Sequence, residues 1–253
     1  MTSKQPRVGE RMGTVTLVGG GPGDPGLVTV AGREAIATAD VILTDRLVPG
    51  AALAWARPDA QIIDVSKAPG GRSTDQREIN RLLIEHAKEG RDVVRFKGGD
   101  SFVFGRGGEE LLACADAGID AHVIPGVSSA TAVPAIAGIP VTHRGLSQAV
   151  TVVSGHVPPG HPDSTVDWTA LARTGSTIVV LMGVRTLEAI ADALLDGGLD
   201  PTTPAAVVVE GTLPSQQVVR ADLVDIAQAA SAAGVSAPAV TVVGDVAGLG
   251  LAP

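Results

Sequence analysis

The segment RFKGGDSFVFGRGGEE, residues 95–110, is the most informative part of this chain. It follows an apolar pair, Val93 and Val94, that predicts a buried strand, and it leads into an apolar stretch at 111–115 that predicts a helix. A glycine-rich loop between a strand and a helix lets backbone N–H groups approach a ligand closely. Because this loop also carries Asp100 and a group of cations, it predicts a ligand site on an α/β fold.

Short apolar runs alternate with helix-like stretches through the first half of the chain. The predicted strands lie at 14–18, 41–43, 62–64, 93–96 and 122–124, and the predicted helices at 28–38, 76–89 and 108–117. Continuous apolar strands separated by helices are typical of a mostly parallel sheet that is covered on both faces.

The second half of the chain has a different pattern. Its predicted strands lie at 149–154, 177–182, 205–209, 217–220 and 240–243, and its predicted helices at 126–138, broken by Pro134, at 186–195 and at 223–232. The short spacing between the third and fourth of these strands suits an antiparallel hairpin, so we expect a mixed sheet. We therefore predict two α/β domains, an N-terminal one with glycine-rich loops at 13–127 and a C-terminal one with the mixed sheet at 128–250.

Composition excludes several classes of protein. A net charge of −8 and an aromatic content of 2% argue against a nucleic-acid partner. The single cysteine, Cys114, excludes an internal disulfide and any Cys-x-x-Cys motif. No apolar stretch approaches the roughly 20 residues that span a bilayer, so we expect a soluble cytoplasmic protein without a membrane partner. We expect no metal site, because His143 and His156 lack a third ligand at metal spacing.

A second glycine-rich loop, GGGPGD at 19–24, follows the first predicted strand. A dinucleotide-binding loop occupies this position, but Asp24 stands where the Gly-x-Gly-x-x-Gly pattern needs its last glycine, and Pro22 stiffens the turn. The loop is therefore a phosphate loop, a purely structural turn or, as we favour, a loop that shapes a pocket for a ligand without phosphates.

Charged residues follow three successive strands of the predicted parallel sheet. Asp45 and Arg46 follow the second strand, Lys67 the third, and Lys97 and Asp100 the fourth. Ligands of open parallel sheets bind at the carboxyl ends of the strands, so these charges indicate a pocket there, although a solvated ion pair in a loop is the alternative for the first two. Because Asp45 ends a strand at this edge, its carboxylate need not be buried in a core ion pair.

Ten blocks of the sequence together resemble, in their order and spacing, the tetrapyrrole methylases, and within that family the uroporphyrinogen-III C-methyltransferases. The resemblance covers nearly the whole chain, from about 13 to about 246. The blocks lie at 18–25, 39–41, 45–48, 78–80, 95–110, 123–129, 138–145, 154–156, 182–183 and 210–212.

The resemblance implies two α/β domains with the methyl donor S-adenosylmethionine in the cleft between them, no metal, and a homodimer. By motif, Asp45 matches the family's presumed proton acceptor and Lys67 its presumed proton donor. The residues that would line the cofactor site are Pro22, Gly98, Gly99, Asp100, Val103, Ser128, Ser129, Met182 and Gly211.

The implied reaction is the transfer of two methyl groups to uroporphyrinogen III, which gives precorrin-2 for sirohaem or cobalamin biosynthesis. This substrate carries many carboxylates, and a chain of net charge −8 must concentrate cations locally to bind it. The candidates for binding the substrate are Arg46, Lys97, Arg106, His143 and Arg144, with Lys67 and Arg72 as further cations.

Three other functions stay open at this point. Another precorrin C-methyltransferase would differ in the acceptor carbon. An NAD-dependent oxidoreductase would use the loop at 19–24, whose glycine spacing counts against it. A non-enzymatic tetrapyrrole carrier would need no methyl donor, and the match at 98–100 counts against it.

Overall fold

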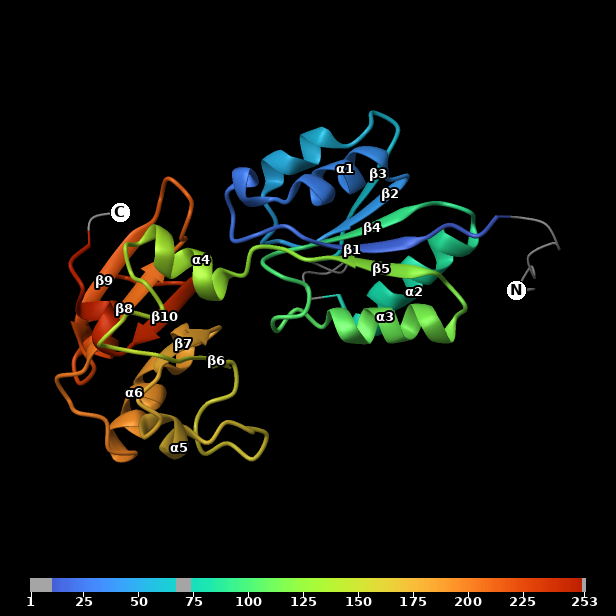
Figure 1. The fold of residues 1–253 in the computed structure, drawn as a ribbon. Coiled ribbons are helices and arrows are strands. Elements are labelled where there is room, and N and C mark those ends of the chain that lie inside the picture. The colour runs from blue at the N-terminus through green and yellow to red at the C-terminus, as the bar shows by residue number, and fades with distance from the viewer. Residues whose placement is uncertain (1–10, 67–73, 252–253) are drawn as a thin grey trace. The chain divides into compact units, whose positions relative to one another are not determined.

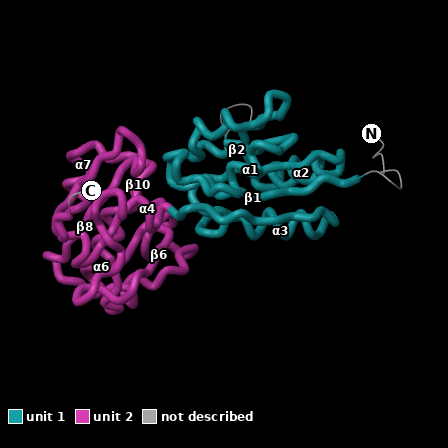
Figure 2. The backbone as a smooth tube through the Cα atoms, turned by 45° about the horizontal axis from the view of Figure 1, so that its top comes forward, with its two compact units in different colours: residues 1–128 teal, residues 129–253 magenta. Residues whose placement is uncertain are grey.

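The computed structural model describes residues 11–66 and 74–251. The chain divides into two compact units of similar size, and the boundary between them falls between Ser128 and Ser129 (Figure 2). Each unit is a single β-sheet with helices packed on both of its faces (Figure 1).

The sheet of unit 1 has five strands, all parallel, in the order β3-β2-β4-β1-β5. The strands are β1 (Val15–Gly19), β2 (Val41–Thr44), β3 (Gln61–Asp64), β4 (Val93–Lys97) and β5 (Ala121–Ile124). One face carries α1 (Val30–Thr38) and the short 3-10 helices η1 (Pro25–Leu27) and η2 (Gly50–Trp55); the other carries α2 (Gln76–Lys88) and α3 (Gly107–Asp116) (Figure 1). The predicted parallel sheet with helices on both faces is confirmed.

Alternate residues of these strands build two separate cores in unit 1. Leu17 and Leu43 pack with α2 and α3, whereas Val18 and Phe96 pack with α1. The helix α2 forms because the side chain of Asp75 caps its first turn and a buried stripe recurs every four residues. These cores place the ends of β1, β2 and β4 at one edge of the sheet.

The sheet of unit 2 is mixed, in the order β6-β7-β10-β8-β9, with only β6 and β7 paired in parallel. Its strands are β6 (Val150–Ser154), β7 (Thr177–Leu181), β8 (Pro204–Val209), β9 (Gln217–Asp222) and β10 (Ala239–Val243). The core on one face contains residues of α5 (Trp168–Ala172), α6 (Leu187–Asp196) and α7 (Ile226–Ala232). The other contains residues of α4 (Ser129–Ile136) and η4 (Asp245–Gly248). The predicted hairpin is confirmed, because β8 and β9 pair antiparallel.

Two helices of unit 2 differ from the sequence prediction. The helix α4 continues through Pro134 instead of breaking there, because Ala130, Val133 and Pro134 are all buried and packing holds the short helix together. The five-residue helix α5 was not predicted, since one helical turn leaves no periodic pattern. Within the described segments no helix is long and apolar enough to cross a membrane.

Candidate functional site

The loops that follow β1, β4 and β5 come together at the carboxyl edge of the unit 1 sheet. Gly21 and Gly99 exchange backbone hydrogen bonds of 3.1 and 2.7 Å. A Cβ atom on Gly126 would lie 2.3 Å from the carbonyl oxygen of Gly99, and one on Gly19 would lie 2.5 Å from the Cα atom of Gly126. Both positions therefore need glycine because three backbone segments touch here.

Asp100 ties these loops to one another. Its Oδ1 accepts a hydrogen bond of 2.8 Å from the backbone N–H of Phe102, and its Oδ2 accepts one of 2.9 Å from the backbone N–H of Gly126. The carboxylate thus fixes both its own loop and the loop after β5. Any contact it makes with a ligand comes in addition to this structural role.

Asp45 lies directly after β2, and its carboxylate pairs with a buried arginine. The Nη2 atom of Arg95 lies 2.6 Å from Oδ1 of Asp45, and the side chains are 2% and 32% exposed respectively. Asp45 thus has a buried ion-pair partner, while its own side chain stays partly exposed. The reason is that Arg95 points to the same face of the sheet and reaches across from β4, which is the neighbour of β2.

Arg95 and Lys97 share one buried counter-ion. Oε1 of Glu110, in the first turn of α3, lies 3.0 Å from Nε of Arg95, 3.0 Å from Nζ of Lys97 and 3.1 Å from Nε2 of Gln76. Burial lowers the pKa of Lys97, and the positive charge of Arg95 lowers it further. The charge of Lys97 is thus already engaged inside unit 1.

Sequence reasoning missed Arg95, Glu110 and Gln76 as parts of this site. A signal was present, because Arg95 and Lys97 are two cations at alternate positions of a strand that is otherwise apolar. Side chains at alternate positions share one face of a sheet. Buried cations require a partner, so an acidic residue had to lie on a covering helix.

The other predicted substrate-binding cations lie at the surface. Arg46 is exposed at the end of β2, and exposed Arg106 forms an ion pair with Glu109 at 2.7 Å. His143 and Arg144 lie in an exposed turn of unit 2. Among the described residues no group of three or more His, Cys, Asp or Glu side chains could hold a metal ion. Lys67 and Arg72 lie outside the described residues.

Three exposed apolar side chains accompany the charged ones at this edge of unit 1. Leu47, Phe102 and Phe104 are 46%, 57% and 45% exposed. Leu47 closely approaches the loop after β4, since a Cβ atom on Gly98 would lie 2.9 Å from that of Leu47. In a chain with three phenylalanines, two of them at the surface of one loop suggest contact with an apolar ligand surface.

Unit 2 contributes strained backbone at the carboxyl ends of two of its strands. Met182 follows β7, and Glu210 and Thr212 follow β8; all three adopt left-handed φ angles, of 59°, 47° and 75°. Non-glycine residues in this conformation are rare and concentrate at functional sites. Gly211 lies between two of them, and a Cβ atom there would lie 2.5 Å from Cγ1 of Val133 in α4.

The remaining predicted cofactor residues lie in the same loops, except Ser129, which is the first residue of α4. Pro22 is half-buried in the loop after β1, and Val103 is half-buried in the loop after β4. Ser128 and Ser129 are half-buried at the boundary between the units. The structure therefore places the unit 1 residues around one sheet edge and Met182 and Gly211 at the corresponding edge of the unit 2 sheet.

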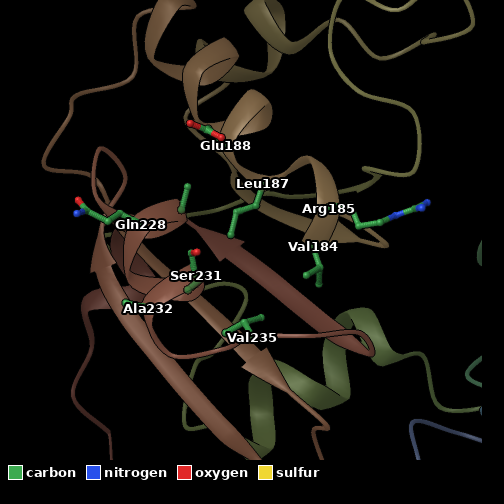
Figure 3. A pocket seen from close by; sticks show the side chains of 10 residues that line it. Val184, Arg185, Leu187, Glu188, Gln228, Ser231, Ala232 and Val235 are labelled. Carbon is green, nitrogen blue, oxygen red and sulfur yellow. The ribbon is translucent and has the colours of Figure 1, made fainter.

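A hollow of about 760 Å³ in unit 2 is separate from these residues (Figure 3). It lies between the segment that begins α6 and the helix α7, and small or apolar side chains such as Leu187, Ser231 and Val235 line it. Arg185 and Gln228 extend outwards on opposite sides (Figure 3). None of the predicted site residues lines this hollow.

The fold and site define an α/β protein of two units, each with an open sheet whose strand ends carry glycine-rich or strained loops. The chain belongs to the tetrapyrrole (corrin/porphyrin) methylases, whose family model matches residues 14–227. The family predicted from the sequence motifs is thereby confirmed.

Known relatives and solved structures support this assignment along nearly the whole chain. The S-adenosyl-L-methionine-dependent uroporphyrinogen III methyltransferase of Methanosarcina barkeri is 49% identical over 92% of each chain. The uroporphyrinogen-III C-methyltransferase of Methanocaldococcus jannaschii is 47% identical over 92% of this chain and 96% of its own.

Two solved structures share the fold. The uroporphyrin-III C-methyl transferase of Thermus thermophilus, complexed with S-adenyl homocysteine, superposes with a TM-score of 0.78 at 40% identity over 92% of this chain and 98% of that one. A cobalt precorrin-4 methyltransferase superposes with a TM-score of 0.83 at 27% identity over 92% of this chain and 95% of that one.

Proposed function

We propose that this protein transfers two methyl groups from S-adenosylmethionine to uroporphyrinogen III and releases precorrin-2, a precursor of sirohaem and cobalamin. The observation that carries the proposal is the identity of 49% and 47%, over 92% of the chain, to two proteins named for this reaction. The Thermus thermophilus structure contains S-adenyl homocysteine, which is what remains of the donor after transfer.

A second candidate is methylation of a later precorrin. It is supported by the TM-score of 0.83 to the cobalt precorrin-4 methyltransferase, which exceeds the 0.78 of the Thermus thermophilus enzyme. Backbone similarity is shared across the family, however, whereas the identity falls from 40% to 27% between these two structures. The acceptor is chosen by side chains, so we favour uroporphyrinogen III.

The residues proposed for the cofactor suit S-adenosylmethionine better than a dinucleotide. S-adenosylmethionine carries a cationic sulfonium and has no phosphates. The proposed set contains one charged side chain, the carboxylate of Asp100, and no cation. A pyrophosphate would meet no positive side chain there. These residues would hold the donor through backbone groups of the two glycine-rich loops in unit 1 and through Met182 and Gly211 in unit 2.

The chemistry requires alignment more than side-chain nucleophiles. A carbon of an electron-rich pyrrole attacks the methyl group in line with the sulfur, the carbon–sulfur bond breaks, and S-adenosylhomocysteine leaves with the electron pair. Alignment of two reactants contributes about 7–11 kcal/mol. One proton must leave the macrocycle for each methyl group gained, and we assign Asp45 to accept it. Lys67 is the proposed proton donor.

Substrate recognition in this proposal combines cations with an apolar surface. Arg46 and Arg106 are exposed in the loops after β2 and β4, and Phe102 and Phe104 are exposed in the loop after β4. His143 and Arg144 add an exposed polar turn in unit 2. Lys97 contributes a buried positive charge, which is paired with Glu110. Carboxylates at the rim of a tetrapyrrole would bind the arginines, and the macrocycle would cover the apolar side chains.

The proposed function is tested by incubation with uroporphyrinogen III and S-adenosylmethionine, followed by the mass of the product. We expect the mass of two added CH₂ units and two equivalents of S-adenosylhomocysteine. Methylation of a precorrin but not of uroporphyrinogen III would support the second candidate. If no S-adenosylhomocysteine is released with either acceptor, both candidate functions are contradicted.

Replacing Arg46 or Arg144 with alanine should raise the KM for uroporphyrinogen III by about tenfold, the loss expected for one charged hydrogen bond. The affinity for S-adenosylmethionine should not change. Arg57→Ala is the matched control, because Arg57 pairs with Asp40 and Asp59 at the opposite end of β2. A wild-type KM in both variants at low salt would contradict the role of these cations.

Asp100→Ala should weaken S-adenosylmethionine binding by about 10-fold or more, because two backbone N–H groups lose their acceptor and the loops after β4 and β5 separate. Isothermal titration calorimetry measures this loss. Asp200→Ala is the control, since its carboxylate likewise accepts a backbone N–H, from Thr202, but lies before β8. Equal affinity in Asp100→Ala and the wild type would remove Asp100 from the site.

The proposal includes a cytoplasmic homodimer whose cofactor lies between the domains at 13–127 and 128–250. The resemblance of the sequence motifs implies the dimer and the position of the cofactor, and the composition of the chain suggests the location. Sedimentation equilibrium at micromolar concentration tests the dimer, and a monomer at every concentration would contradict it.

A further inference from the structure

Two nitrogen atoms of Arg95 are held by three groups that are themselves part of the fold. Nε donates to Glu110 at 3.0 Å, and Nη1 donates to the carbonyl oxygens of Leu43 and Phe96 at 3.4 and 3.3 Å. Only Nη2 points to the edge of the site, where it donates to Asp45 at 2.6 Å. A planar guanidinium fixed at its other nitrogens can point its last one in a single direction.

We propose that Arg95 is the positioning residue for Asp45, and that buried Glu110 sets Arg95 in place. The inference rests on the proposed function, in which Asp45 accepts the proton.

Arg95 and Asp45 differ in burial and therefore in whether they can contact the substrate. The side chain of Arg95 is 2% exposed and that of Glu110 is fully buried, so neither meets a substrate at the edge of the sheet. Asp45 is 32% exposed and remains reachable. Arg95 therefore acts on the reaction through the carboxylate that it holds.

The charges of the cluster balance without help from solvent. Arg95 and Lys97 supply two positive charges, and Asp45 and Glu110 supply two negative ones. The hydrogen bond from Nη2 of Arg95 to Oδ1 orients the carboxylate of Asp45 within this cluster. Orientation of a base is worth up to about 10²-fold per ångström of displacement.

The test uses Arg95→Lys in the full-length chain. A lysine keeps the positive charge but lacks the fork that joins Asp45 to Glu110 and to the two carbonyls. We expect kcat to fall about 10- to 100-fold, with KM and the affinity for S-adenosylmethionine unchanged. Arg57→Lys, at the ion pair with Asp40 before the start of β2, should keep the wild-type kcat.

A double variant separates positioning from a structural role. If Arg95 acts through Asp45, Arg95→Lys combined with Asp45→Asn should be no slower than Asp45→Asn alone, to within about twofold. Two independent losses that multiply would overturn the inference, and so would a wild-type kcat in Arg95→Lys. A wild-type protein that does not methylate uroporphyrinogen III would instead contradict the proposed function, which is measured first.

A second variant guards against a folding defect in Arg95→Lys, which circular dichroism and cofactor titration would reveal. Glu110→Gln keeps an oxygen that accepts from Nε of Arg95, but the loss of the negative charge weakens this hydrogen bond. We expect a smaller fall in kcat at constant KM, and again no further loss when Asp45→Asn is added. If the losses in kcat of Glu110→Gln and Asp45→Asn multiply in the double variant, the inference is also overturned.

Discussion

Replacing Asp45 with asparagine should lower kcat by about 10²–10⁴-fold, which corresponds to roughly 2.7–5.5 kcal/mol in the activation barrier. Asparagine has nearly the same shape and keeps an oxygen that accepts from Nη2 of Arg95. It cannot take a proton at neutral pH. The substitution therefore removes the proposed base and leaves its surroundings in place.

The effect of Asp45→Asn on stability should be much smaller. Arg95 keeps Glu110 and two backbone carbonyls as partners, so the variant loses about 1–2 kcal/mol of unfolding free energy. Asp40→Asn is the matched control: it makes the same substitution at the other end of β2, where Asp40 pairs with Arg57. It should lose stability but keep kcat. Near wild-type turnover in Asp45→Asn would exclude the role as base.

The fold was predictable because its signals are local and repeated. Largely apolar runs favour a sheet covered on both faces. The central strands β2 and β4 are buried at every position, whereas the edge strands β3 and β5 are partly exposed. The short link between the strands now seen as β8 and β9 required an antiparallel pair. Each of these inferences uses only residues that are close together in the sequence. None requires knowledge of how distant segments contact one another.

The candidate site was predictable as an edge but not as a set of contacts. That Asp45, Asp100 and the glycine loops share one edge follows from parallel strands alone. That Asp45 pairs with Arg95 depends on the order of β2 and β4 in the sheet, which the sequence does not state. The bond from Gly126 to Asp100 likewise joins residues whose loops meet only in the folded chain.

Glu110→Ala should cause the largest loss of stability in unit 1, about 3–5 kcal/mol, because it leaves the buried charges of Arg95 and Lys97 without their common counter-ion. Glu110 is fully buried, and its Oε2 has no hydrogen-bond partner among the described residues. The hydrogen bonds of its side chain therefore all pass through Oε1.

The neighbouring residue provides the control for Glu110→Ala. Glu109 also pairs with an arginine, Arg106, but both side chains are more than half exposed, so Glu109→Ala should cost less than about 1 kcal/mol. Equilibrium unfolding in urea measures both variants. Similar losses in the two would show that Glu110 carries no buried ion pair.

The dependence on pH distinguishes a charge effect from a cavity at position 110. Burial already lowers the pKa of Lys97 from its ordinary 10.5, so between the folded and the unfolded pKa the unfolded chain binds more protons and stability rises with pH. Without Glu110 the folded pKa falls further and this interval widens. The penalty in Glu110→Ala is thus complete below the folded pKa and shrinks as the pH rises towards the ordinary value. A loss that stayed constant across this interval would mean that the missing volume of the side chain, and not its charge, destabilises the variant.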